Sequence, residues 1–126
     1  MRKIAVCYLI KDHQVLLIRV HYPDGKEIWN GVSGWVEDGE TPEQGIIREI
    51  KEEIGVNVKE EDLRLAFQPK SWEAPAAIFT TLKWQGKPKS GEKSIREVRW
   101  FNFEEVPFNE MIEDNEDWLP RILGLT

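Results

Sequence analysis

One helix is marked at both of its ends, by Thr41 and by Gly55. Thr41 is followed by Pro42 at the first helical position and Gln44 at the third, which together make a capping box. Gly55 stands where a left-handed C-cap is expected. Apolar side chains recur between these ends at 3.6-residue spacing: Ile46, Ile47, Ile50 and Ile54. The sequence therefore predicts a helix from about Pro42 to Ile54 that packs a stripe of isoleucines on a core.

Three glutamates share one edge of this predicted helix, on the flank of the isoleucine stripe: Glu49, Glu52 and Glu53. Like charges three and four residues apart destabilise a helix. A divalent cation reverses that effect, because Mg²⁺ takes oxygen ligands, keeps several waters and is commonly completed by substrate phosphates. Gly45 projects into the same arc one to two turns earlier, and we expect its missing side chain to leave space there for metal and phosphate.

The alternative is that the three glutamates form a solvated face paired with Arg48 and Lys51. The spacing of the whole block favours the metal-binding interpretation. From Gly34 to Val56 the chain reads G-x5-E-x7-R-E-U-x-E-E-x-G-U, with U an aliphatic residue, and it resembles the Nudix hydrolase signature at every fixed position. The resemblance implies an α/β (α+β) fold, the Nudix α/β/α sandwich with a mixed β-sheet and a loop-helix-loop motif. It also implies Mg²⁺- or Mn²⁺-dependent hydrolysis of a nucleoside diphosphate linked to another group.

Carried over by position, the resemblance also implies a role for each residue of the block. Glu49, Glu52 and Glu53 would bind the metal, with the carbonyl of Gly34 as a further ligand. Glu49 is the first candidate for the base that makes a water nucleophilic. The remaining positions have supporting roles: Arg48 would orient the adjacent glutamate by an ion pair, and Gly39 and Glu40 would shape the loop.

A further acid is expected in the connection that leads into the strand ending at Trp100 and Phe101. The expected position, near Ser94 or Ile95, is not acidic. Glu92 and Glu97 are the nearest substitutes. A second departure lies ahead of the block, where Ser33 stands in place of a glycine found in many members of the family.

Residues outside the block point to a substrate. Trp29-Asn30-Gly31, residues 98–101, residues 106–108 and residues 114–119 resemble the subgroup that hydrolyses oxidised purine nucleoside triphosphates. In that subgroup an amide and an acidic pair read the base edge, which implies roles for Asn30, Asp114 and Asn115. The alternative for 114–115 is an ordinary N-cap of the last helix. A base could also stack on Trp29, Trp35 or Trp72, and the alternative is that these rings are simply buried.

These residues together predict a Mg²⁺-dependent enzyme that cleaves a nucleoside triphosphate to the monophosphate and pyrophosphate, with 8-oxo-dGTP or a related purine as the lead substrate. Another nucleoside diphosphate derivative is the nearest alternative: ADP-ribose, a dinucleoside polyphosphate or dihydroneopterin triphosphate. A catalytically silent module that binds a nucleotide is the alternative from another class of protein.

Composition bounds the remaining expectations. The chain has 126 residues, 40% of them hydrophobic and six of them tryptophan, enough to bury the core of a single domain spanning residues 1–126. A net charge of −6 argues against binding a nucleic acid polymer and favours a small nucleotide partner. The lone Cys7 lies in an apolar run typical of a buried strand. With no membrane-spanning stretch, we expect a cytoplasmic protein without a membrane partner.

The rest of the chain reads mainly as strands. Residues 3–10 and 14–20 predict a hairpin around a turn at residues 11–13. Residues 63–68, 76–84 and 97–103 predict further strands, and residues 21–26 predict a loop that overhangs the substrate. Trp29 is expected in a loop or at an edge. Pro120 is tolerable only in the first turn of the last helix, so that helix is expected to start late.

Overall fold

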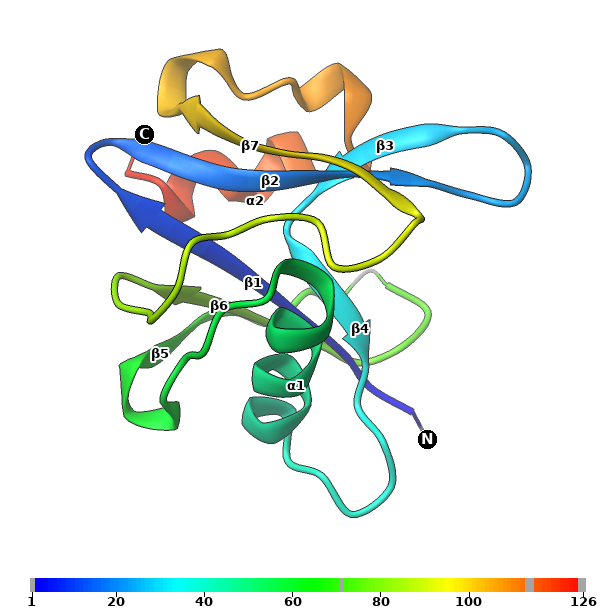
Figure 1. Ribbon diagram of the computed structural model, residues 1–126, viewed down its shortest axis with the longest axis vertical. Coiled ribbons are helices and arrows are strands. Elements are labelled where there is room, and N and C mark those ends of the chain that lie inside the picture. The colour runs from blue at the N-terminus through cyan, green and yellow to red at the C-terminus, as the bar shows by residue number, and fades with distance from the viewer. Residues whose placement is uncertain (1, 71, 113–114, 125–126) are drawn as a thin grey trace.

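A computed structural model describes residues 2–70, 72–112 and 115–124, and it has two α-helices on a strongly twisted sheet (Figure 1). The strands are β1 (Ile4–Lys11), β2 (Gln14–His21), β3 (Glu27–Asn30), β4 (Val32–Trp35), β5 (Leu63–Phe67), β6 (Ala76–Thr81) and β7 (Ile95–Asn102). The helices are α1 (Pro42–Ile54) and α2 (Asn115–Ile122), with short 3₁₀ turns η1 (Glu60–Asp62), η2 (Phe103–Glu105) and η3 (Phe108–Glu110).

The first strand organises the sheet. Its first part pairs with β4 antiparallel and with β6 parallel, and its last residues pair with β2. Strand β5 extends the sheet beyond β6, while β3 and β7 both pair with β2. The predicted β1–β2 hairpin is confirmed. Its two turn residues, Asp12 and His13, have φ values of 51° and 62°, the left-handed conformation that two-residue hairpins need.

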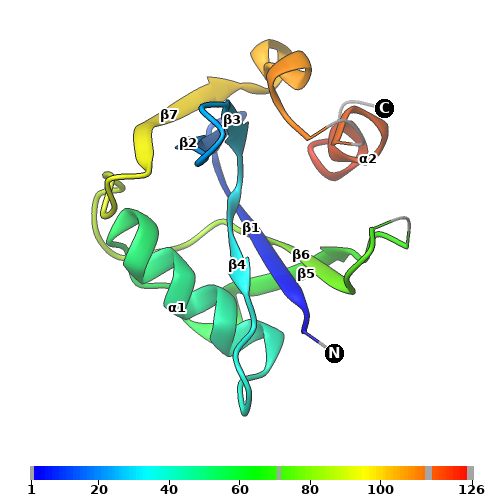
Figure 2. The ribbon, with the colours of Figure 1, turned by 90° about the vertical axis from the view of Figure 1, so that its right-hand side faces the viewer.

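Two hydrophobic clusters lie on opposite faces of β1 and β2, because alternate side chains point to opposite sides of a strand. Cys7, Leu9, Leu16 and Ile18 face the cluster that contains α1. Tyr8, Val15 and Leu17 face the cluster that contains α2. Figure 2 shows the two helices on different sides of the sheet. Cys7 is fully buried, as expected.

Helix α1 begins and ends at the predicted residues. Thr41 accepts a hydrogen bond from Gln44 N, Gln44 returns one to Thr41 N, and Gly55 adopts φ 74° at the C-cap. Three of the four isoleucines of the stripe are completely buried. The expectation for Gly45 is wrong: a Cβ there would lie 3.3 Å from Glu40 Oε1 and 3.4 Å from Val36. Gly45 packs under the preceding loop and opens no space for a ligand.

Trp29 lies in β3, which is an edge strand of the sheet as expected, but its side chain is only 5% exposed and belongs to the core. One further expectation needs correction. Pro120 lies in the second turn of α2, and the helix begins at Asn115. The proline removes a backbone donor from the helix interior. That loss is offset by the burial of Trp118 and Leu119 against the sheet. No helix among the described residues is long and apolar enough to cross a membrane.

Candidate active site

The loop that leads into α1 is tied to the helix by Arg48. The guanidinium donates to both carboxylate oxygens of Glu40, at 2.9 and 3.1 Å, and to the carbonyl of Trp35 at 3.0 Å. Glu40 also accepts from the backbone N–H of Glu37 at 2.9 Å. Gly39 turns the loop with φ 85°, a left-handed conformation that suits glycine. Glu40 therefore ties the loop to Arg48 and Glu37, and the loop-shaping role of Gly39 and Glu40 stays a prediction.

The same guanidinium reaches two glutamates of the helix. Arg48 Nη1 donates to Glu49 Oε1 at 2.6 Å and to Glu52 Oε2 at 3.3 Å. The hydrogen bond to Glu40, followed by the bond and charge of Glu49, raises the pKa of Arg48 above its ordinary value, and the bond from Arg48 is the main reason that the pKa of Glu40 is lowered. Arg48 therefore holds the Glu49 carboxylate in one orientation while it holds the loop.

A second contact of Glu49 is with another acid. Glu53 is 8% exposed and shares a side-chain hydrogen bond with Glu49. Burial, followed by this bond and the charge of Glu49, raises the pKa of Glu53 to about 9. The backbone N–H of Ser33 donates to Glu53 at 3.5 Å and opposes the shift. Burial and the neighbouring Glu49 therefore favour the protonated form of Glu53 when no metal is bound.

Strand β4 passes directly beside this pair. A Cβ on Gly34 would lie 2.1 Å from Glu49 Oε2 and 2.2 Å from its carboxyl carbon, so only glycine leaves room for that carboxylate. The sequence singled out Gly34 as a backbone ligand. The structure adds a steric reason for its identity.

The glutamate side chains of α1 are only partly arranged to bind a hard cation. Glu49 and Glu53 offer adjacent carboxylate oxygens, the ligand type that Mg²⁺ and Mn²⁺ take. Glu52 is half exposed and turned to Arg48. Within residues 2–70, 72–112 and 115–124, no three acidic, histidine or cysteine side chains already enclose a metal position. Because Mg²⁺ keeps several waters and takes substrate phosphates, two protein carboxylates are compatible with a site completed by the substrate.

A cavity of about 550 Å³ opens next to the carboxylate pair. Ser33 and Gly34 line it and also contact Glu53 and Glu49. The rest of its wall consists of Ile4, Val6, Tyr22, Asn30, Trp35, Trp72, Glu73, Ala74 and Ile112. Tyr22 belongs to the loop after β2, which the sequence predicts to overhang the substrate. Its pKa is raised by burial and then by the charge of Glu53.

The residues predicted to read a base are only partly brought together. Asn30 is 6% exposed, lines the cavity and accepts a hydrogen bond from Gly31 N at 2.8 Å. Asp114 lies outside the described residues. Asn115 is buried at the start of α2 and is not in the cavity wall. Its carboxamide makes no hydrogen bond with any other described residue.

The two substitutes for a further acid differ in their surroundings. Glu97 lies on β7 and pairs with Arg99 at 2.5 Å and with Arg19 at 3.3 Å. Glu92 lies in the connection after β6, and its charge contributes to the raised pKa of Glu53. Of the two acids, Glu92 is therefore the one whose charge acts on Glu53. The sequence alone could not show which of Glu92 and Glu97 acts on Glu53, because their positions depend on how the strands pair.

Several residues of the cavity wall are missing from the sequence-based predictions. Ile4 and Val6 alternate along β1 and point into the cavity from the sheet. Tyr22 carries no chemical signal of its own, although its loop does. These residues converge from the start of β1, the loop after β2 and the segment before β6, and only the fold brings those segments together.

A family model decides the classification. The NUDIX domain matches residues 1–122, nearly the whole chain. The chain belongs to the Nudix family. The expected mixed-sheet α+β fold is confirmed. The chain is thus a Nudix hydrolase of pyrophosphate-bond substrates, and hydrolases of this family generally use divalent metal ions.

Individual Nudix relatives agree with this. An oxidized purine nucleoside triphosphate hydrolase of Danio rerio is 29% identical over 124 residues, which cover 95% of this chain and 78% of the relative. An RNA pyrophosphohydrolase of Tolumonas auensis is 33% identical over 99 residues, 78% of this chain and 51% of the relative. A solved MutT NUDIX hydrolase from Burkholderia pseudomallei superposes with a TM-score of 0.79 at 20% identity, covering 99% of this chain and 97% of that one.

Proposed function

We propose that this Nudix hydrolase is a Mg²⁺-dependent diphosphatase that cleaves a nucleoside triphosphate to the monophosphate and pyrophosphate, with an oxidised purine such as 8-oxo-dGTP as the lead substrate. One observation carries the proposal. The buried Glu49–Glu53 pair adjoins a cavity of about 550 Å³, a size typical of small-molecule sites. Phosphates in the mouth of that cavity would lie beside the carboxylates, with the nucleoside deeper in it.

In this proposal both glutamates bind the metal, and Glu49 also acts as the base. Glu49 and Glu53 would hold the cation, with Glu52 and the Gly34 carbonyl as further ligands, and Glu53 would bind it as the carboxylate although its pKa is raised in the metal-free protein. The cation supplies charge neutralisation at the phosphates and a more acidic water. Glu49 is our first candidate for the base, because Arg48 fixes the direction of its carboxylate.

The substrate assignment depends on the cavity wall. Asn30 is buried there and can offer an amide donor and acceptor to a purine edge, although its oxygen already accepts from Gly31. Trp35 and Trp72 offer ring faces on which a base can stack. Asp114 and Asn115 remain proposed base-recognition residues on the strength of the resemblance to the oxidised-purine subgroup. The Danio rerio relative carries that activity in its name.

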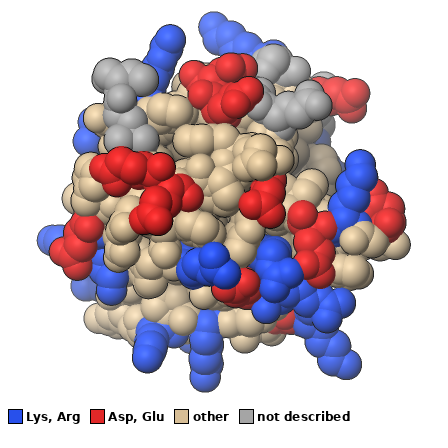
Figure 3. All heavy atoms as spheres, turned by 90° about the horizontal axis from the view of Figure 1, so that it is seen from above, with Lys and Arg blue, Asp and Glu red and all other residues tan. Residues whose placement is uncertain are grey.

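The surface charge supports a small substrate. Figure 3 views the molecule from the top of Figure 1, and on that face acidic and basic side chains are interspersed around an uncharged centre. The coloured residues form no continuous basic surface there. Together with the net charge of −6, this favours a mononucleotide over a long nucleic acid.

Release of pyrophosphate and phosphate from a nucleotide panel, with and without Mg²⁺, tests the proposal. The panel contains 8-oxo-dGTP, dGTP, dATP, dihydroneopterin triphosphate, diadenosine tetraphosphate and ADP-ribose. Metal-dependent pyrophosphate release with the highest kcat/KM for 8-oxo-dGTP is expected. Preference for another member would retain the mechanism and reject the base assignment. No turnover on any member would favour a nucleotide-binding module.

A matched pair of variants tests the metal role. Glu53→Gln should reduce turnover at least about a hundredfold while the protein stays folded, and Glu43→Gln, the same change in the first turn of the same helix, should not. Full activity of Glu53→Gln would reject the role of this residue. Stacking is tested by Trp35→Leu and Trp72→Leu, with Trp84→Leu as a control on a tryptophan outside the cavity. An unchanged KM in both test variants would rule out stacking.

A further inference from the structure

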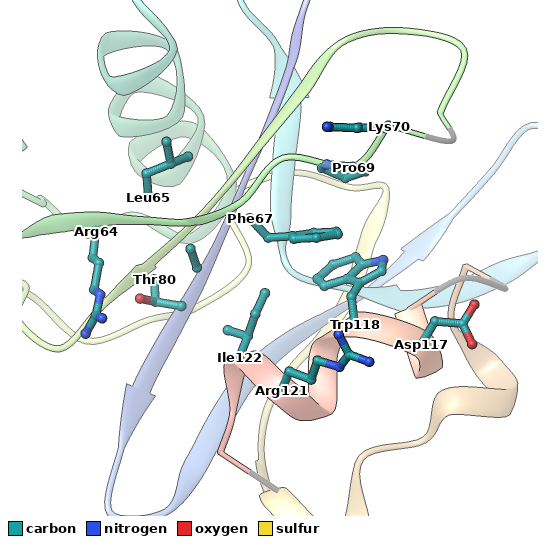
Figure 4. Close-up of a pocket in the computed structure, with 11 residues that line it drawn as sticks. Arg64, Leu65, Phe67, Pro69, Lys70, Thr80, Asp117, Trp118, Arg121 and Ile122 are labelled. Atoms are coloured by element: carbon teal, nitrogen blue, oxygen red, sulfur yellow. The ribbon is translucent and has the colours of Figure 1, made fainter. Parts of the chain in front are cut away.

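A second and larger cavity, of about 640 Å³, lies between β5 and α2 (Figure 4). It shares no lining residue with the candidate active site. Its wall consists of Arg64, Leu65, Ala66, Phe67, Pro69, Lys70, Thr80, Asp117, Trp118, Arg121 and Ile122. No residue of helix α1 lines this cavity, so the cavity has no role in the proposed reaction.

The charge of this wall is opposite to that of the chain. Arg64, Lys70 and Arg121 line the cavity, against one acid, Asp117. Figure 4 shows Arg64 on the β5 side and Arg121 on the α2 side. None of the three cations forms an ion pair or a side-chain hydrogen bond with another residue that the structure describes. In a protein of net charge −6, three cations around one cavity that pair with no described residue offer a local position for an anion.

The same wall holds an exposed aromatic ring. Phe67 stacks on Trp118 with ring centroids 5.4 Å apart and an interplanar angle of 26°. Trp118 is 7% exposed and fixed in the core, while Phe67 remains 37% exposed. Phe67 is thus a firmly supported ring with accessible surface. Such a ring suits stacking with a planar heterocycle, which costs little conformational entropy.

We propose that this cavity is a second ligand site, which binds a phosphate attached to a planar ring, in practice a nucleoside monophosphate. Arg121, which lies beside Trp118 in Figure 4, takes the phosphate, since a guanidinium group matches its oxygens in two-point contacts, and Arg64 adds positive charge from the β5 end of the cavity. Phe67 stacks on the base. Asp117 and Thr80 supply hydrogen-bond partners for ribose hydroxyls or a base amino group. An apolar ligand would desolvate the cationic side chains without forming ion pairs with them. Inorganic phosphate alone would make no contact with the Phe67 ring.

The two cavities meet at a pair of tryptophans. Trp72, in the wall of the candidate active site, packs edge-on against Trp118 at 6.4 Å between centroids. The ligand can therefore come from two sources. It is either a free nucleotide or the second nucleoside of a substrate that has two. The chemistry recognised by Arg64, Arg121 and Phe67 is the same for both.

Binding of AMP to the full chain in EDTA tests the site without any need for activity. Amide and indole NMR shifts report the place of binding, with inorganic phosphate and adenosine as partial ligands. AMP should shift the signals of Phe67, Trp118 and Arg121, and it should bind at least tenfold more tightly than either partial ligand. The double variant Arg64→Met/Arg121→Met should weaken AMP binding at least tenfold. Arg96→Met, an equivalent change at an exposed arginine on β7, should not.

Two results would overturn the proposal. One is AMP shifts confined to the signals around Asn30 and Tyr22. The other is AMP affinity equal in the wild-type protein and the double variant. Phe67→Leu gives an independent check, because it keeps the cations: it should weaken AMP while leaving phosphate binding unchanged.

Diadenosine tetraphosphate distinguishes the two sources. If one diadenosine tetraphosphate molecule binds per chain, shifts signals in both cavities and binds more tightly than AMP or ATP, the second cavity holds the second nucleoside of a substrate. If two AMP molecules bind independently to each chain, the ligand of the second cavity is a free nucleotide. In either case the Arg64→Met/Arg121→Met variant must lose the signals of the second cavity, and their retention would reject the site.

Discussion

Gly34 and Glu49 occupy adjoining space, with no room for even one methyl group between the glycine and the carboxylate. A Cβ built on Gly34 would meet Glu49 Oε2 at 2.1 Å. The contact joins β4 to the helix at the point where the carboxylate pair meets the cavity. The direction of Glu49 is thus set from two sides, by the backbone of Gly34 and by the guanidinium of Arg48.

The first prediction concerns Gly34→Ala. The methyl group would push away the Glu49 carboxylate, which is the far end of a flexible side chain, so the protein should fold normally. Misplacing a catalytic group by about 1 Å can cost about a hundredfold in rate, and we expect kcat/KM to fall by about that factor. Steady-state kinetics and a thermal melt provide the check.

Gly45→Ala is the matched comparison, because its new Cβ would meet Glu40 Oε1 at 3.3 Å, a contact relieved by a shift of a few tenths of an ångström, and alanine favours a helix. It should keep activity within about threefold. Equal losses in the two variants would show that the Gly34–Glu49 contact has no special importance.

The second prediction concerns Arg48→Lys. Arg48 bonds both oxygens of Glu40, the Trp35 carbonyl and Glu49 at once, and a lysine keeps the charge but not that geometry. We expect kcat/KM to fall at least about tenfold and the amides of residues 35–40 to exchange faster with solvent. Hydrogen exchange followed by mass spectrometry measures the second effect. Arg96→Lys serves as the control, and loop exchange that is the same in both variants would contradict the role of Arg48 in the loop.

The third prediction is a pH dependence of stability. Glu53 has a folded pKa of about 9 against an ordinary value of 4.5, so between these values the folded state binds more protons than the unfolded state. The free energy of unfolding of the metal-free protein should therefore fall as the pH rises from about 5 to about 9, and it should not change through this group below about 4.5. Thermal melts in EDTA across this range measure the effect.

Glu53→Gln isolates this dependence, since glutamine has the same shape and does not ionise. At pH 8 the metal-free variant should melt at least about 5 °C above the wild type, and the difference should shrink towards pH 5. Mg²⁺ should stabilise the wild type at pH 8 more than the variant. A wild-type Tm that stays level or rises from pH 5 to 9 relative to Glu53→Gln would contradict the protonated pair.

Local signals explain why α1 is predictable to the residue. Its capping box, proline and left-handed glycine all act within one or two turns of the chain. The ion pair of Arg48 and Glu49 is implied by the family resemblance and not by their adjacency, because neighbouring residues of a helix do not in general face each other. Strands β3 and β4 have four residues each, too few for an alternating pattern to stand out, so Trp29 looks like a loop residue before the sheet buries it.

The errors at the site come from contacts between distant segments. A helical wheel places Gly45 in the arc of the carboxylates, but it contains no information about the loop that folds back over that position. The convergence of Tyr22, Trp72 and Ser33 on one cavity depends on the pairing of β1 with β4 and β6. The larger cavity is also invisible in the sequence, because Arg64 and Arg121 come from an edge strand and the last helix.

The fourth prediction concerns the end of the catalytic helix. The connection after β6 covers that end, where Gly91 N donates to the carbonyl of Glu53 at 2.8 Å and Lys89 N donates to that of Ile54 at 3.1 Å. A Cβ on Gly91 would lie 2.4 Å from the carbonyl oxygen of Glu52, an atom of rigid helix backbone. In Gly91→Ala the connection must therefore move off the helix, which loses both hydrogen bonds and withdraws the Glu92 charge from Glu53.

We expect Gly91→Ala to lower the Tm by several degrees and to raise the Mg²⁺ concentration needed for half-maximal activity at least about threefold. Lys89→Ala keeps the backbone donor and removes only an exposed side chain, so it should change neither quantity. A magnesium titration of activity and a melt of each variant make the comparison. Normal metal dependence together with a lowered Tm would show that the connection only stabilises the helix. A normal value for both would show that the close approach of Gly91 to Glu52 has no consequence.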